Sequence, residues 1–263
     1  MEFTVLGSSA SFAGPGQACS GYLVSSGATA VMLDCGNGTI ANAAGVTDVT
    51  TLAAVMVSHT HADHFLDLYA LQAALRFSPD GPVGSLPVYL PDGLWERMGA
   101  LLPEKGRAGL AQAFEPRTIE AGARCVFGPL AITAYPVEHD GPSFGFVIEA
   151  DGARVVYTGD TCDSDAARAL ADGCDVLVAD CTLPQSHAGM AAHMTGTEAG
   201  LLASASRARL LVLTHLWPTA DHDAMRDEAA AVFDGEVLLA HEFMTIEIGS
   251  PDGEPCEEEE VQR

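Results

Sequence analysis

Four side chains that commonly bind metal ions lie within six residues, in the sequence His59-Thr-His61-Ala-Asp63-His64. They follow the apolar run 52–58, which predicts a strand. Imidazoles and a carboxylate crowded at a strand end would be costly in an apolar core, because their polar atoms would lack partners. A pair of divalent ions about 3.5–4 Å apart would supply those partners. A chance surface cluster is the alternative interpretation, but six residues rarely match so demanding a pattern by accident.

Three more metal-competent residues stand at the ends of other apolar segments. His139 comes soon after 130–134, Asp160 after 155–157, and His215 ends the segment 210–215. Each one alone has an ordinary explanation, such as a hydrogen-bonded histidine or a helix cap. Because all three would lie at the same rim of a sheet as the first motif, together they predict one site.

This set of residues resembles the pattern His-x-His-x-Asp-His and the downstream ligands of the metallo-β-lactamase-fold hydrolases. The resemblance implies one ion held by His59, His61 and His139, a second held by Asp63, His64 and His215, and Asp160 as a bridge between them. Imidazole and carboxylate ligands without thiolate suit Zn²⁺ best, with Mn²⁺ or Fe²⁺ as alternatives. Two cations that share one water lower its pKa and supply hydroxide near pH 7, which is the chemistry of hydrolysis.

His193 is the predicted general acid for a poor leaving group such as an alkoxide. Its surroundings resemble the Gly-His-Ser/Thr motif of the phosphodiesterase branch, which includes ribonuclease Z and small cyclic-phosphodiester hydrolases. The chain departs from that motif, because Ala192 replaces the glycine and Met194 precedes Thr195. The other interpretation of this segment is that Thr195 or Thr197 caps a helix, and both can hold.

Asp180 stands where this branch has an acidic residue that orients the histidine, so it is the predicted partner of His193. His187 is a less favoured partner, because nothing beside it in the sequence fixes its position. His193, Asp180 and Asp63 are thus the predicted catalytic residues. The resemblance also implies that Asp34 braces the ligand loop without binding metal. The Gly/Ser-rich loop within 3–16 would bring backbone close to the metals or to a phosphate.

The substrate is expected to be small. Ribonuclease Z enzymes carry a long arm that grips tRNA, and in the bacterial form it lies between the positions of His139 and Asp160, where this chain has room only for a hairpin turning at Asp151-Gly152. The chain has 12 Lys+Arg against 36 Asp+Glu, a formal net charge of −24, with Lys105 as its one lysine. It lacks the clustered cations that a nucleic acid requires, although the acidity also fits a solvated surface in a saline host.

Composition indicates a single cytoplasmic domain. The 263 residues are 48% hydrophobic, enough to bury a sizeable core, and no apolar run is long enough to span a membrane. The seven cysteines form no C-x-x-C pair and are odd in number, which is typical of reduced thiols. A homodimer is left open by the resemblance to relatives that dimerise.

Hydrophobic periodicity predicts an α/β protein, and the resemblance implies an αββα sandwich in residues 1–250. Helices are expected near 64–76, 92–101, 163–171, 195–204 and 221–232. Residues 78–120 are expected to be the least regular region and to form a lid over the site. The acidic tail 251–263 is expected to be disordered.

The predicted function is therefore that of a dinuclear metal phosphodiesterase acting on small or cyclic phosphodiesters, with cAMP as the leading substrate by resemblance. The alternative within enzymes is a ribonuclease Z-type tRNA 3′-processing endonuclease. The alternative from another class is a catalytically silent metal-binding or regulatory protein.

Overall fold

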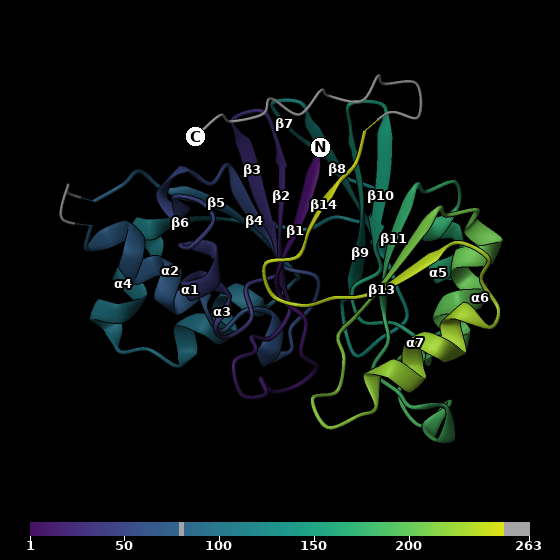
Figure 1. Cartoon of the computed structure of the whole chain (residues 1–263). Helices are drawn as coiled ribbons and strands as arrows, with labels where there is room; N and C mark the ends of the chain where they lie inside the picture. The colour runs from purple at the N-terminus through teal and green to yellow at the C-terminus, as the bar shows by residue number, and fades with distance from the viewer. Residues whose placement is uncertain (79–81, 250–263) are drawn as a thin grey trace, which may run out of the picture.

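Strands with alternating inward and outward side chains form two seven-stranded sheets in the computed structural model, which describes residues 1–78 and 82–249 (Figure 1). The first sheet has the order β14-β1-β2-β3-β4-β5-β6, with β1 (Glu2–Gly7), β2 (Gly21–Ser26), β3 (Thr29–Leu33), β4 (Ala54–Met56), β5 (Leu86–Leu90), β6 (Phe114–Thr118) and β14 (Thr245–Glu247). The second has the order β13-β12-β11-β10-β9-β8-β7, with β7 (Arg124–Phe127), β8 (Leu130–Pro136), β9 (Phe144–Ala150), β10 (Ala153–Tyr157), β11 (Val176–Asp180), β12 (Leu210–Thr214) and β13 (Glu236–Leu239).

Helices cover the outer face of each sheet, so the molecule has four layers (Figure 1). Beside the first sheet lie α1 (Thr39–Ala43), α2 (Leu68–Arg76), α3 (Leu94–Ala100) and α4 (Glu104–Ala113). Beside the second lie α5 (Asp165–Ala171), α6 (Gly196–Ser206) and α7 (His222–Ala230). Short 3-10 turns are η1 (Val49–Thr51), η2 (Ala62–His64) and η3 (Gln185–His187).

Successive side chains of a strand point to opposite faces of its sheet, so they join different apolar cores. In β1, Phe3 and Val5 join the apolar cluster between the two sheets, whereas Leu6 joins the cluster beneath the helices of the first sheet. A third cluster lies between the second sheet and α5–α7. Each sheet is therefore apolar on both faces, as an inner layer of a sandwich must be.

Parallel strands bring polar segments to one rim. β3 and β4 are parallel in the first sheet, and β10, β11 and β12 are parallel in the second. Because parallel strands end at the same edge of a sheet, the loops that follow them meet there. These loops contain candidate metal-binding residues, among them His59, Asp160 and His215.

The αββα sandwich of one domain is confirmed. The predicted hairpin between His139 and Asp160 is also confirmed, because β9 and β10 pair antiparallel around Asp151 and Gly152. The predicted helix 64–76 begins later than expected, since η2 precedes α2.

The expectation of an irregular lid over 78–120 is wrong. Apart from 79–81, which lie outside the described residues, this region forms β5, α3, α4 and β6. Leu94, Met98 and Leu110 are buried in the cluster beneath the helices, so α3 and α4 belong to the outer layer. β6 escaped prediction because Pro116 argues against a strand, but β6 lies at the edge of its sheet, where proline is tolerated. The tail 251–263 lies outside the described residues.

Candidate metal centre

The loop after β4 presents two pairs of polar side chains to the rim. His59, which lies before the η2 turn, is fully buried. The turn itself contains Asp63 and His64, and both of these side chains are buried as well. The turn is fixed by the His64 backbone N–H, which donates to the carbonyl of His61 at 3.1 Å. Gly36 permits this packing, because a Cβ there would lie 2.0 Å from the carbonyl oxygen of Asp63.

Three other strand ends supply the remaining residues. Asp160 follows β10 after Gly159, whose φ of +59° turns the chain toward the rim, and a Cβ at Gly159 would lie 2.6 Å from the carbonyl oxygen of Phe144. His215 follows β12 with a φ of 53°, a left-handed conformation that few non-glycine residues adopt. The ring of His139 is held by its Nδ1–H, which donates to the carbonyl of Ala192 at 3.0 Å.

The structure brings all seven residues together in two groups. His59, His61, His139 and Asp160 form one, and Asp63, His64 and His215 form the other, with the candidate ligand atoms of each group within 4.8 Å of one another. Asp160 lies between them. Its Oδ2 is 3.5 Å from His59 Nε2 and 3.4 Å from the Nε2 atoms of His64 and His215.

Two buried atoms in this cluster have no hydrogen-bond partner, namely His59 Nε2 and Asp160 Oδ1. Unpaired buried polar atoms are costly, and a cation beside them would remove the cost. Burial lowers the pKa of the His59 imidazole well below its ordinary value, so the ring is neutral, the form that binds metal. Burial raises the pKa of Asp160, but the imidazoles of His215 and His64 outweigh it and hold that pKa well below its usual range. A neutral imidazole and an ionised carboxylate fit divalent cations.

Asp34 braces one of these histidines without lying in either group. Its Oδ1 accepts from the Ser58 backbone N–H at 2.6 Å, and its Oδ2 accepts from Ser58 Oγ at 2.9 Å and Tyr157 OH at 2.7 Å. His64 Nδ1 lies 2.9 Å from the same Oδ2. This contact directs Nε2 of His64 toward the cluster, as a carboxylate behind a ligand does in metal sites.

His193 lies beside the cluster and is held by Asp180. His193 Nδ1 is 2.7 Å from Asp180 Oδ2, and the carboxylate is fully buried while the imidazole is 15% exposed. Burial lowers the pKa of His193, but the Asp180 carboxylate outweighs it and raises the pKa to about 9. One ring nitrogen of His193 lies within 4.8 Å of ligand atoms of Asp160 and His215. A protonatable group thus faces the place where the cations would lie.

Thr182 is a residue of the site that sequence reasoning missed. Its hydroxyl donates to Asp180 Oδ1 at 2.7 Å and lies 2.8 Å from His215 Nδ1, which can donate to it. Asp180 therefore supports His193 directly and His215 through Thr182. The available signal was its place two residues after Asp180, just past the end of β11.

Ser11 is a second residue that the sequence did not single out, although the loop that contains it was expected to lie near the metals. Its backbone N–H donates to Asp63 Oδ2 at 2.7 Å, in a left-handed conformation with φ of 60°. The N-terminal loop thus touches a candidate ligand through its backbone. Burial raises the pKa of Asp63, but its contacts with His215 and His64 outweigh this effect and lower it below the ordinary range.

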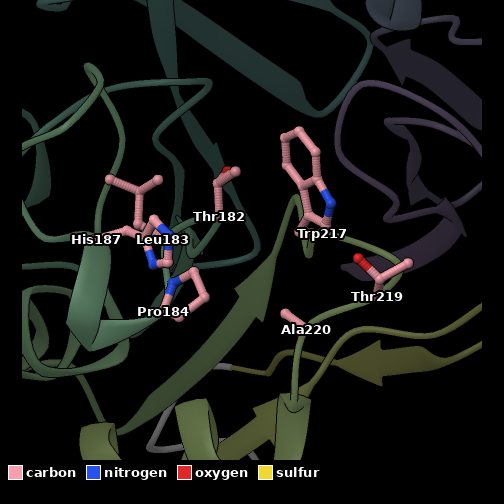
Figure 2. Close-up of a pocket in the computed structure, with 7 residues that line it drawn as sticks. All are labelled: Thr182, Leu183, Pro184, His187, Trp217, Thr219 and Ala220. Carbon is pink, nitrogen blue, oxygen red and sulfur yellow. The ribbon is translucent and has the colours of Figure 1, made fainter.

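His187 does not join the cluster. It is exposed, it contacts Ser186 Oγ through Nδ1 at 2.9 Å, and it lines a cavity of about 340 Å³ beside the site (Figure 2). The other lining residues are Thr182, Leu183, Pro184, Trp217, Thr219 and Ala220.

A family model described as "Beta-lactamase superfamily domain" matches residues 29–216, a span that holds all seven residues of the cluster. The chain belongs to the β-lactamase superfamily. It is 33% identical over 244 residues to "Probable metallo-hydrolase YhfI" of Bacillus subtilis (strain 168), covering 91% of this chain and 97% of YhfI. The crystal structure of YhfI matches with a TM-score of 0.83 at 30% identity, over 93% of this chain and 98% of that one.

Ribonuclease Z of Mycobacterium bovis (strain BCG / Pasteur 1173P2) is 30% identical over 277 residues, covering 94% of this chain and 98% of the enzyme. These relatives place the chain in the ribonuclease Z-like branch of the superfamily. The protein is a metallo-hydrolase of that superfamily, with a His/Asp cluster able to bind metal ions. None of the helices in the described residues is long and apolar enough to cross a membrane.

Proposed function

We propose that this protein is a dinuclear metal phosphodiesterase that hydrolyses small or cyclic phosphodiesters such as cAMP. The observation that carries the proposal is the 2.7 Å contact between His193 and the buried Asp180, beside a cluster fit for two cations. An enzyme that hydrolyses activated esters needs no general acid at this place. An enzyme that hydrolyses phosphodiesters with an alkoxide leaving group does need one.

The proposed ligands are His59, His61 and His139 for one ion and Asp63, His64 and His215 for the other, with Asp160 shared. Zn²⁺ suits these ligands best, and Mn²⁺ or Fe²⁺ are the alternatives. When bound, the cations would supply an activated water and offset the negative charge that develops on the phosphoryl oxygens.

His193 and Asp180 handle the leaving group. With its Nδ1–H directed to Asp180, His193 keeps Nε2 available for the substrate, and its raised pKa keeps it protonated near neutral pH. In the reaction, Nε2–H gives its proton to the departing alkoxide oxygen as the P–O bond breaks. Asp180 stabilises the imidazolium beforehand and fixes the ring orientation.

Charge and shape support a small substrate. The net charge of −24 opposes binding of a polyanion, while a single phosphodiester carries one negative charge that two dications attract. The connection between His139 and Asp160 is the β9–β10 hairpin, which leaves no place there for a tRNA-gripping arm.

Ribonuclease activity is the second candidate, favoured by the 30% identity to ribonuclease Z over most of both chains. A catalytically silent metal-binding protein is a third, but the braced pair of His193 and Asp180 would then have no use.

A substrate panel tests the proposal. The Zn²⁺- and Mn²⁺-loaded protein is assayed on cAMP, cGMP, cyclic dinucleotides and a precursor tRNA, with Asp63→Ala as the control for metal dependence. Turnover of a small cyclic diester that disappears in the control is expected. Cleavage of tRNA alone would favour the ribonuclease, and activity on no phosphodiester would reject the phosphodiesterase.

A further inference from the structure

The cavity beside the site has two unlike walls. Figure 2 shows the indole of Trp217 on one side and Leu183, Pro184 and His187 on the other. Its volume of about 340 Å³ falls at the lower end of the range for small-molecule pockets, about 300–1,000 Å³. The cavity is therefore large enough for one ring system and too small for a macromolecule.

Thr182 connects this cavity to the catalytic groups. Thr182 lines the cavity, and its hydroxyl lies 3.3 Å from His193 Nδ1 and 2.8 Å from His215 Nδ1. Trp217 follows His215 by two residues. Through Thr182 the cavity therefore adjoins the groups that would handle the phosphate.

Trp217 is held in place as a partly exposed aromatic surface. Its side chain is 40% exposed, and its ring meets Phe12 edge to face, with centroids 6.0 Å apart and planes at 86°. The two loops that carry these rings are joined by a backbone hydrogen bond, in which the Ala10 N–H donates to the carbonyl of Leu216 at 3.0 Å. Ser11, next to Phe12, donates to Asp63. The loop that carries the indole is therefore connected to the candidate metal centre through the N-terminal loop.

The lining indicates an uncharged occupant. None of the seven residues, all of them within the described chain, is lysine, arginine, aspartate or glutamate. A second phosphate group would find no lysine or arginine among these residues. The hydroxyls of Thr182 and Thr219 and the imidazole of His187 instead offer polar atoms around an apolar interior, which suits the polar edges of a flat heteroaromatic ring.

We propose that this cavity binds the nucleobase of the substrate, with Trp217 as the stacking surface and specificity-determining residue. This inference rests on the proposed phosphodiesterase function and names its substrate class as nucleotides. Stacking on an aromatic side chain binds every base, because every base presents a π-face. The cavity therefore selects for the presence of a base.

The kinetic test compares two cyclic diesters, cAMP and a cyclic phosphodiester of glycerol, which lacks a base. Trp217→Ala should raise KM for cAMP about 10-fold with kcat little changed, and it should leave the glycerol diester unaffected. Trp217→Phe should restore most of the loss. Phe77→Ala removes another exposed aromatic ring away from the cavity and serves as the matched control.

Binding is measured separately by fluorescence. In a Trp95→Phe background Trp217 is the only tryptophan, and the metal-loaded protein is titrated with AMP or with ribose 5-phosphate. Quenching by AMP alone is expected. Equal responses to both ligands, or equal effects of Trp217→Ala on both diesters, would overturn the nucleobase site. Absence of turnover on every diester would instead reject the phosphodiesterase, and the fluorescence result would still decide whether the cavity binds a base.

Discussion

Two histidines each lie against a buried aspartate, and the surroundings of the two pairs differ. His64 and Asp34 are 2.9 Å apart, and both are fully buried. His193 and Asp180 are 2.7 Å apart, but His193 is 15% exposed, and its Nδ1 lies 3.3 Å from the hydroxyl of Thr182, which lines the cavity of Figure 2. Solvent does not reach the side chains of the first pair, whereas it reaches the imidazole of the second.

The same carboxylate–imidazole contact can therefore serve two purposes. Behind His64 it would fix the ring so that Nε2 meets a cation, and Ser58 and Tyr157 lock the Asp34 carboxylate in turn. Behind His193, in the proposed mechanism, it would hold a proton next to the leaving group. Access to solvent, more than the contact itself, distinguishes a ligand brace from an acid.

Asp34→Ala should have the largest effect on the folded state. It removes a buried carboxylate that braces His64, and it takes away the acceptor used by the Ser58 backbone N–H and the Tyr157 hydroxyl. Loss of one member of such a buried network costs about 3–5 kcal/mol, so the free energy of unfolding should fall by that order in denaturant titrations. Metal affinity should also fall about 10–100-fold. A variant with unchanged stability and metal content would contradict the role of Asp34 as a brace.

Asp180→Asn should change the pH dependence of activity. His193 has a pKa raised to about 9 by Asp180, so the acid form is present at neutral pH and is lost as pH rises through that value. Without the carboxylate, the pKa should fall toward the ordinary value of about 6.5, and turnover of alkoxide substrates should decline at lower pH than in the wild type. Bound cations lower the pKa in both proteins, so the difference between their pH–rate profiles is the measurement. Superimposable profiles would exclude Asp180 as the partner of the acid.

Thr182→Val should have the smallest effect of the three. It keeps the side-chain shape and removes the hydroxyl that joins Asp180 to His215. Metal affinity, measured by competition with a chelator, should fall about 10-fold, at the low end for an outer-shell partner. The folded structure should remain, as checked by circular dichroism. If metal affinity fell as far as in Asp34→Ala, the contacts of Asp180 would matter as much for holding the cations as those of Asp34. The distinction between the two histidine–aspartate pairs would then fail.

Four of the candidate ligands could be predicted from the sequence alone because they lie within six residues of one another. His59, His61, Asp63 and His64 need only one turn to meet, whereas Asp160 and His215 meet them only through the parallel order of β10, β11 and β12. Periodicity could not give that order, and the resemblance implied only the αββα sandwich that contains it. The structure places these residues together, and their roles as ligands stay predictions.

Other parts could not be predicted for physical reasons. Ser11 contributes through its backbone N–H, which no side-chain pattern reveals, and its φ of 60° depends on tertiary contacts. Thr182 matters because of the direction of one hydroxyl. α4 contains Gly106 and Gly109 and has few apolar residues, so its helical periodicity is weak.

If His193 protonates the leaving group, its replacement by alanine should slow only those substrates whose leaving group needs a proton. His193→Ala is compared with the wild type on cAMP, whose leaving group is an alkoxide, and on bis(p-nitrophenyl) phosphate, whose leaving group needs no acid. Metal content is measured in both proteins. We expect a loss of about 10²–10⁴-fold on cAMP, a much smaller loss on the activated diester, and unchanged metal content. Equal losses on both substrates, or loss of metal, would contradict it.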